Sequence, residues 1–84
     1  MPIFKPEPLY TEEARKTKLQ GVVDLMIVVD PDGNVAFARV LKPLGMGLDE
    51  SARETVKTWR FKPARRNGSP VPVRVMVQVS FRLF

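Results

Sequence analysis

Side chains that could carry acid–base or nucleophilic chemistry are few in this chain of 84 residues. It has no cysteine and no histidine, which excludes thiolate nucleophiles, Cys/His zinc sites and the usual general base near neutral pH. Asp30 and Asp32 form one close carboxylate pair, but with Pro31 and Gly33 they make a typical turn sequence and lack the other ligands of a calcium loop. The serines have no histidine to activate them. We therefore predict a non-enzymatic domain without a metal or cofactor.

Two other motifs allow a binding function. Residues 45–47, Gly-Met-Gly, precede a helix, but they lack the rest of a phosphate-binding motif and indicate an ordinary loop. Trp59 and Phe61 alternate with basic residues, as in proteins that bind single-stranded nucleic acid. The alternative, which we favour, is that both rings pack into the core while their basic neighbours stay in water. A nucleic-acid surface would use Lys57, Arg60, Lys62, Arg65 and Arg66.

The net charge of +5 is unevenly distributed along the chain. Residues 1–54 contain seven basic and nine acidic groups, whereas residues 55–84 contain seven basic groups and no acid. A basic half is compatible with an anionic partner or with a solvated polar surface. The longest apolar run, Leu25–Val29, is far shorter than the ~20 residues that cross a bilayer.

The elements that must position any site follow from hydrophobic periodicity. Residues 1–8 predict a linker remnant, followed by one domain over residues 9–84. The predicted helices are Tyr10–Lys18, with Thr11 as N-cap, and Leu48–Trp59. The predicted strands are Val22–Asp30 and Asn34–Lys42, joined as a hairpin, and a third that follows a loop over Pro63–Pro72.

Alternation predicts which strand residues face the core. In the hairpin these are Val23, Leu25, Ile27 and Val29, and then Ala36, Ala38 and Val40. Phe37 is then left exposed. The predicted fold class is α+β, a two-layer sandwich of αββαβ order. Its antiparallel sheet has three strands in the order 2-1-3, with two helices packed on one face.

The last strand is the best candidate for a functional surface. From Val73 onward it alternates strictly between apolar and polar or flexible residues, and the predicted order places it at an edge of the sheet. An exposed regular edge is normally avoided because it recruits other chains. We therefore predict that it pairs with an extended peptide or with a copy of itself. The predicted partner-binding residues are Arg74, Val75, Met76, Val77, Gln78, Val79, Ser80 and Arg82.

Several segments resemble the C-terminal domain of TonB-family energy transducers, over about residues 8–83. The more specific ones are LDE at residues 48–50, WRFKPA at residues 59–64, and NG followed by PVPV at residues 67–73. The resemblance implies a periplasmic module of a Gram-negative envelope, in a protein anchored in the inner membrane by a segment outside this sequence. It also implies that the last strand pairs with the TonB box of outer-membrane transporters, for nutrient uptake such as that of iron-siderophores, and that the ExbB–ExbD motor energises the protein. A self-associating structural module, as a homodimer, and a nucleic-acid-binding domain remain the alternatives.

Overall fold

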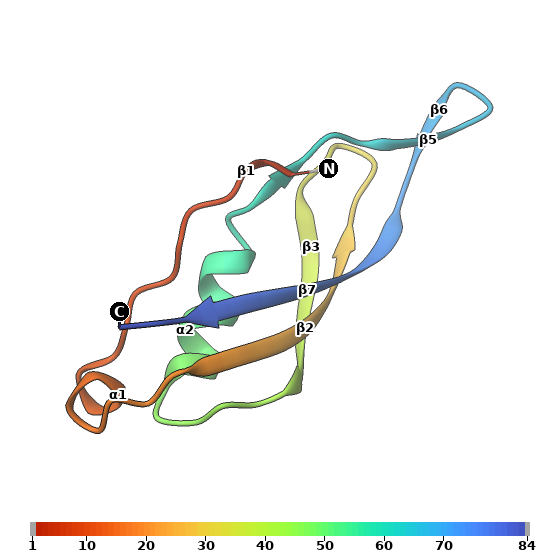
Figure 1. Ribbon diagram of the computed structural model, residues 1–84. Coiled ribbons are helices and arrows are strands. Elements are labelled where there is room, and N and C mark those ends of the chain that lie inside the picture. The colour runs from red at the N-terminus through yellow and green to blue at the C-terminus, as the bar shows by residue number, and fades with distance from the viewer. Residues whose placement is uncertain (1, 84) are drawn as a thin grey trace.

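The computed structural model describes residues 2–83, and the side chains of residues 5–83 (Figure 1). In chain order, the elements are β1 (Pro2–Phe4), α1 (Glu12–Lys16), β2 (Gly21–Val29), β3 (Val35–Lys42), α2 (Leu48–Val56), β4 (Arg60–Phe61), β5 (Ala64–Arg66), β6 (Ser69–Val71) and β7 (Val73–Phe81).

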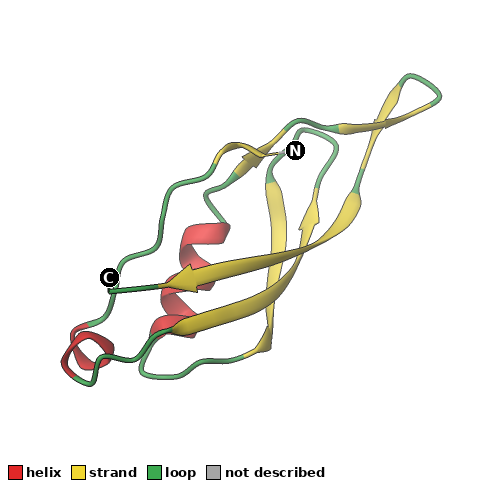
Figure 2. Cartoon of the chain, viewed as in Figure 1, coloured by secondary structure: helices red, strands yellow, loops and turns green. Residues whose placement is uncertain are grey.

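The main sheet has three antiparallel strands in the order β3-β2-β7, which confirms the predicted fold class and strand order. α2 lies against one face of this sheet, and α1 lies near the end where β2 begins (Figure 2). Within residues 2–83, no helix covers the opposite face of the sheet (Figure 2). β2 is therefore the central strand, and β3 and β7 are the two outer ones.

The core lies between the sheet and the helices. The four predicted inward residues of β2, Val23, Leu25, Ile27 and Val29, are at most 2% exposed. They pack in one cluster with Ala14 of α1 and with Leu48, Ala52 and Val56 of α2. Full burial of one such aliphatic side chain contributes about 1.5–3 kcal/mol, so this cluster is the main source of stability.

The pattern predicted for β3 was wrong at Ala36, which is exposed. Val28 pairs with Phe37 and Val29 pairs with Val35, so Ala36 is an extra residue in a β-bulge. A bulge changes the face on which the following side chains lie, which simple alternation does not anticipate. Ala38 is buried and Phe37 is 49% exposed, as expected.

Both helices are shorter than predicted. α1 begins at the predicted cap, because the Ala14 N–H donates to Thr11 Oγ1 at 3.2 Å. It ends before Lys18, whose φ of 56° lies in the left-handed region. α2 ends at Val56, where the Trp59 N–H donates to the Val56 carbonyl in a tighter turn. Trp59 lies beyond the helix, yet it is buried as predicted.

Two small sheets lie outside the main one. β1 pairs with β4, and β5 pairs with β6, all antiparallel. The stretch Pro63–Pro72 was predicted as a loop, and it contains the β5–β6 hairpin instead. Its turn residues Asn67 and Gly68 both have positive φ, 52° and 82°, as the tight two-residue hairpin turns require.

Candidate functional site

The outer edge of β7 is a regular row of backbone groups. Within the described residues, β7 pairs with β2 alone, through nine residue pairs from Gly21–Phe81 to Val29–Val73. The register runs through all nine pairs without a shift. This places the last long strand at the edge of its sheet, where the sequence predicted it.

The register shows which backbone groups of β7 face outward. In an antiparallel pair, hydrogen-bonded and non-bonded residues alternate, so successive residues direct their N–H and C=O to opposite sides. The Asp30 N–H donates to the Asn34 carbonyl at 2.8 Å across the hairpin. Even-numbered residues of β2 therefore face β3, and odd-numbered ones face β7. The backbone groups that point away from β2 consequently belong to the even-numbered residues of β7: Arg74, Met76, Gln78 and Ser80.

The contact between Gln78 and Asp24 agrees with this assignment. The two residues are opposite each other in the register, and Gln78 Nε2 donates to Asp24 Oδ1 at 2.9 Å. Side chains approach more closely in a non-hydrogen-bonded pair. The Gln78 side chain is thus directed toward β2, which leaves its backbone N–H and C=O accessible from the edge.

The predicted site residues fall into two groups. Arg74, Met76, Gln78 and Ser80 are exposed and direct their backbone outward; Arg82 is exposed just beyond the strand. Val75 and Val77 are half-buried, Val79 is 4% exposed, and the backbone of all three faces β2. All eight residues therefore lie together, but the first group is the one that an added strand would meet.

A groove of about 410 Å³ lies beside the C-terminal half of β7. Its walls are residues 78–82 and, opposite them, residues 5–8 together with Tyr10 and Trp59. The Trp59 Nε1–H donates to the Pro6 carbonyl at 3.0 Å, and Lys5 Nζ lies 5.2 Å from the centre of the Trp59 ring. The N-terminal segment is thereby held across from the open edge.

Sequence analysis did not include residues 5–8 in the site, since their prolines and charges resemble a linker. One signal for a contact was present in the sequence: Trp59 was expected to be buried, and a buried indole N–H normally has a hydrogen-bond acceptor. The partner of Trp59 is a backbone carbonyl 53 positions earlier, and no side-chain pattern marks it.

Tyr10, which lines this groove, is held by contacts with two other parts of the chain. Its hydroxyl donates to the Leu19 carbonyl at 2.6 Å, and its ring meets Phe81 edge-on, with 5.5 Å between ring centres. These contacts tie both ends of α1 to the last residue of β7. The position of the groove wall is therefore set by the core.

The other candidate motifs have structural roles. Asp30 Oδ1 accepts hydrogen bonds from the backbone N–H groups of Asp32 and Asn34, at 2.9 and 3.0 Å, which is the turn predicted for this segment. Asp49 accepts hydrogen bonds from the N–H groups of Leu44 and Gly45, so this chain's own carboxylate occupies two donors of the loop before α2. Among the described residues, no cluster of three or more possible metal ligands occurs.

The two aromatic residues of the basic segment belong to the core. Trp59 and Phe61 are 4% and 5% exposed, with 6.4 Å between their ring centres. The prediction that they pack inward is confirmed. They cannot stack on nucleic-acid bases without leaving the core, although their neighbours Arg60 and Lys62 are exposed.

The fold and its edge define a small α+β domain with one regular strand edge on which another strand can be added. Residues 6–83 match the family model described as Gram-negative bacterial TonB protein C-terminal, and the chain belongs to this family. It is 36% identical over 78 residues to Protein TonB of Vibrio cholerae, an overlap of 92% of this chain and 32% of that protein. It is 35% identical over 77 residues to Protein TonB of Xanthomonas campestris, covering 90% of this chain and 34% of that protein.

The fold is also that of a solved relative. The solution NMR structure of the Pseudomonas aeruginosa TonB CTD matches with a TM-score of 0.79 and 23% identity, over 99% of this chain and 85% of that one. The present chain spans about a third of the length of the curated relatives it matches. None of the helices in the part of the chain that the structure describes has the length and apolar character to cross a membrane.

Proposed function

We propose that this domain is the periplasmic docking module of a TonB-type energy transducer. It binds the extended TonB box of an outer-membrane transporter as a further strand on the open edge of β7. The bound strand transmits force for the uptake of nutrients such as iron-siderophores. The proposal combines membership of the TonB C-terminal family with the geometry of this edge.

The observation that carries the proposal is the unshifted register of β7. Because all nine pairs with β2 are in register, the outward N–H and C=O groups recur at every second residue from Arg74 to Ser80. Such a row is the template that strand addition needs. An added strand would also enter the groove between β7 and residues 5–8.

The expected affinity is weak to moderate. Each net backbone hydrogen bond contributes only ~1 kcal/mol, and four outward residues offer four donors and four acceptors at most. These bonds lie across the strand direction, so a pull along the strand loads all of them in shear at once. Because the bonds share the load, such an interface suits the transmission of force.

Selectivity among partners would come from the exposed side chains beside the outward backbone groups. Arg74 and Arg82 are cationic, and Met76 is 67% exposed and flexible. A guest strand projects alternate side chains onto the same face. In full length, the protein would be anchored in the inner membrane and energised by the ExbB–ExbD motor through segments outside this sequence.

An NMR titration tests the proposal directly. A synthetic TonB-box peptide added to the ¹⁵N-labelled domain should shift the amide signals of Arg74–Arg82. Gln78→Pro should abolish the shifts, because it removes an outward N–H without removing a hydrogen bond to β2. Gln78→Ala, which keeps the N–H, is the matched control and should bind. Unchanged spectra at millimolar peptide would overturn the proposal.

The same edge could instead pair with a second copy of the chain. Sedimentation across a concentration series separates the two uses of β7. A stable dimer at micromolar protein, broken by Gln78→Pro, would mean that the edge serves self-association. A monomer that binds the peptide would support the docking function.

A further inference from the structure

Residues 64–71 form a hairpin arm that projects beyond the main sheet (Figure 1). The arm consists of β5, the Asn67-Gly68 turn and β6, and every residue from Arg65 to Pro70 is exposed. The Arg65 Nη1–H donates to the Gly68 carbonyl at 3.1 Å, which braces the turn. The arm is thus a defined structure at one end of a molecule that measures 50 × 20 × 16 Å.

The arm carries positive charge that the described part of the molecule does not neutralise. Arg65 and Arg66 lie on it, with Lys62 before it and Arg74 after it, and the last acidic residue of the sequence is Glu54. Within residues 5–83, the ion pairs are those of α2 alone. Surfaces that need only solubility usually mix both signs, whereas a surface of one sign attracts the opposite charge.

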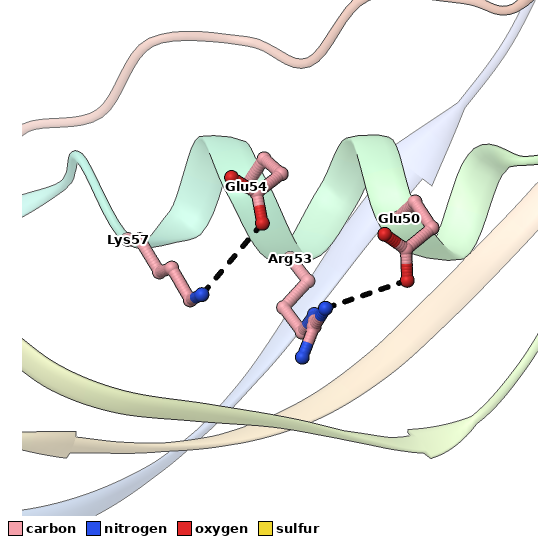
Figure 3. A network of polar contacts seen from close by, with 4 residues as sticks. All are labelled: Glu50, Arg53, Glu54 and Lys57. Atoms are coloured by element: carbon pink, nitrogen blue, oxygen red, sulfur yellow. Dashed lines mark hydrogen bonds and ion pairs between the residues drawn. The ribbon is translucent and has the colours of Figure 1, made fainter.

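The basic side chains at α2, in contrast, form ion pairs with acidic side chains of the same helix. Arg53 pairs with Glu50 at 3.4 Å, and Lys57 pairs with Glu54 at 3.6 Å, each one turn apart (Figure 3). Each exposed pair contributes little to stability. The pairs do, however, reduce the attraction of this helix for other anions. The arm has no such arrangement.

The arm adjoins the docking edge. β6 ends at Val71, and only Pro72 separates it from Val73, the first residue of β7. A strand paired along β7 therefore has one end beside the base of the arm. Each strand of the arm has three residues, or roughly 10 Å at ~3.3 Å per residue. Three or four residues of a guest chain beyond its paired segment could reach along it.

We propose that the arm binds acidic residues that flank the strand-paired segment of the guest, on the side that lies beside Val73. The inference depends on the proposed docking function. Guanidinium groups hold carboxylates through paired, charge-assisted hydrogen bonds, so Arg65 and Arg66 suit this partner. The contact adds affinity and fixes the direction of the guest strand.

Other anionic partners fit the arm less well. The turn residues Asn67 and Gly68, with Ser69 and Pro70, offer no aromatic side chain for stacking on bases and no large apolar side chain for insertion into a bilayer. The acidic flank of a guest already aligned on β7 needs no further element of recognition.

The test uses four synthetic peptides that share one TonB-box sequence. The first is this sequence alone, the second has four glutamates added at its N-terminus, and the third has four glutamates added at its C-terminus. The fourth has four glutamines added at the end where glutamates give the larger gain in affinity. We expect glutamates at one end only to tighten binding by about threefold to tenfold at 50 mM salt, the gain of one or two exposed ion pairs. The gain should disappear at 300 mM salt. Glutamines should give no gain. The end that gains reveals whether the guest runs parallel or antiparallel to β7.

Two double variants locate the effect. Arg65→Gln with Arg66→Gln should remove the gain from glutamate and leave the affinity for the unextended peptide unchanged. Arg15→Gln with Lys16→Gln removes the same charge from exposed positions of α1 and should retain the gain. Anionic vesicles containing 30% phosphatidylglycerol serve as a competing probe.

The outcomes separate the two proposals. If the unextended peptide does not bind, the docking function is wrong. If it binds but glutamates give no gain, equal gains at both ends, or a gain that survives in the arm variant, the function stands and the role of the arm is wrong. Arm-dependent binding to the vesicles without an effect on the peptides would assign the arm to lipid and overturn the inference.

Discussion

The two outer strands of the main sheet differ in regularity. β7 pairs with β2 through nine residues without interruption. β3 pairs with the same strand, but its register shifts twice, at Ala36 and at Leu41. Bulges are one of the devices by which proteins blunt exposed edges. One edge of the sheet is therefore irregular and the other is left as a template.

Each outer strand has a groove beside it, and the two grooves differ in what forms the opposite wall. β3 ends at Lys42 before Pro43, and α2 packs against the strand on the core side. β7 faces a groove whose far wall, residues 5–8, is fastened to Trp59. A groove of about 440 Å³ lies beside β3 too, lined by residues 37–40 and 43 and by Asp49, Glu50 and Arg53. The feature that separates the two edges is therefore the register, and under the proposed docking function β7 is the better template because its register is unbroken.

The largest effect is expected from proline at Val77. Its backbone faces β2, so Val77→Pro removes a ladder hydrogen bond and leaves an acceptor on β2 unpaired. We expect a loss of about 3 kcal/mol in the free energy of unfolding, a large part of the stability of so small a domain. Urea denaturation measures it.

The neighbouring position is the control. Gln78→Pro should cost less than half as much, since its N–H points away from β2. Equal losses at the two positions would show that the assignment of outward and inward backbone groups is wrong.

An intermediate effect is expected at the wall of the groove. Trp59→Phe removes the hydrogen bond from the indole to the Pro6 carbonyl and reduces packing, at a cost of about 1–2 kcal/mol. Because residues 5–8 then lose their anchor, peptide affinity should also fall.

Lys5→Gln is the milder change at the same place. It removes only the cation–π contact and should lower the free energy of unfolding by at most about 0.5 kcal/mol at this exposed site. Unchanged peptide affinity in Trp59→Phe would separate the N-terminal segment from the site.

A deletion tests whether the bulge at Ala36 protects β3. Deletion of Ala36 restores a regular register between Val35 and Phe37 and should alter stability by no more than about 1 kcal/mol. In the wild-type domain, the TonB-box peptide should shift amide signals along β7 and leave those of β3 unchanged. In the deletion variant, signals within the former Val35–Val40, the part of β3 before the second bulge at Leu41, should shift as well. If they stay unchanged, the bulge at Ala36 is not what prevents pairing at this edge.

Only the β7 side of this contrast could be predicted from the sequence, because that prediction rests on periodicity. The alternation after Val73 predicted a strand with one apolar face, and the turn at Pro31 and Gly33 predicted that the two preceding strands pair as a hairpin. The simplest arrangement then puts the last strand beside the first of these. The bulge at Ala36 had no such signal, because the extra residue is defined only by its pairing with β2 and not by its residue type. Contacts between positions far apart in the chain are the other feature that the sequence could not predict. The indole of Trp59 donates to the main-chain oxygen of Pro6, and because every residue has such an oxygen, no residue type marks the acceptor.

The turn of the hairpin arm could be predicted from the sequence, but its two strands could not. Asn67-Gly68 is a strong turn signal, and the sequence predicted a break there. Its two strands, each of three residues, are too short to show alternation. A sequence pattern therefore does not distinguish such short strands from a loop. For the same reason the arm is absent from the predicted peptide-binding residues, although Arg65 and Arg66 were named for the alternative of a nucleic-acid surface.

The smallest loss of stability is expected from a variant that removes a side-chain hydrogen bond beside β7 and leaves the backbone pairing intact. Asp24 lies on the exposed sheet face, opposite Lys42 of β3 and Gln78 of β7, and it accepts a hydrogen bond from Gln78. Asp24→Ala removes that bond in a solvent-accessible place, so the loss should be about 0.5 kcal/mol. Peptide affinity should stay within twofold of wild type, because the outward backbone row of β7 is retained. A large loss of affinity in this variant would mean that the Gln78 side chain must be held toward β2 for a guest to pair, and that the edge depends on side-chain order as much as on register.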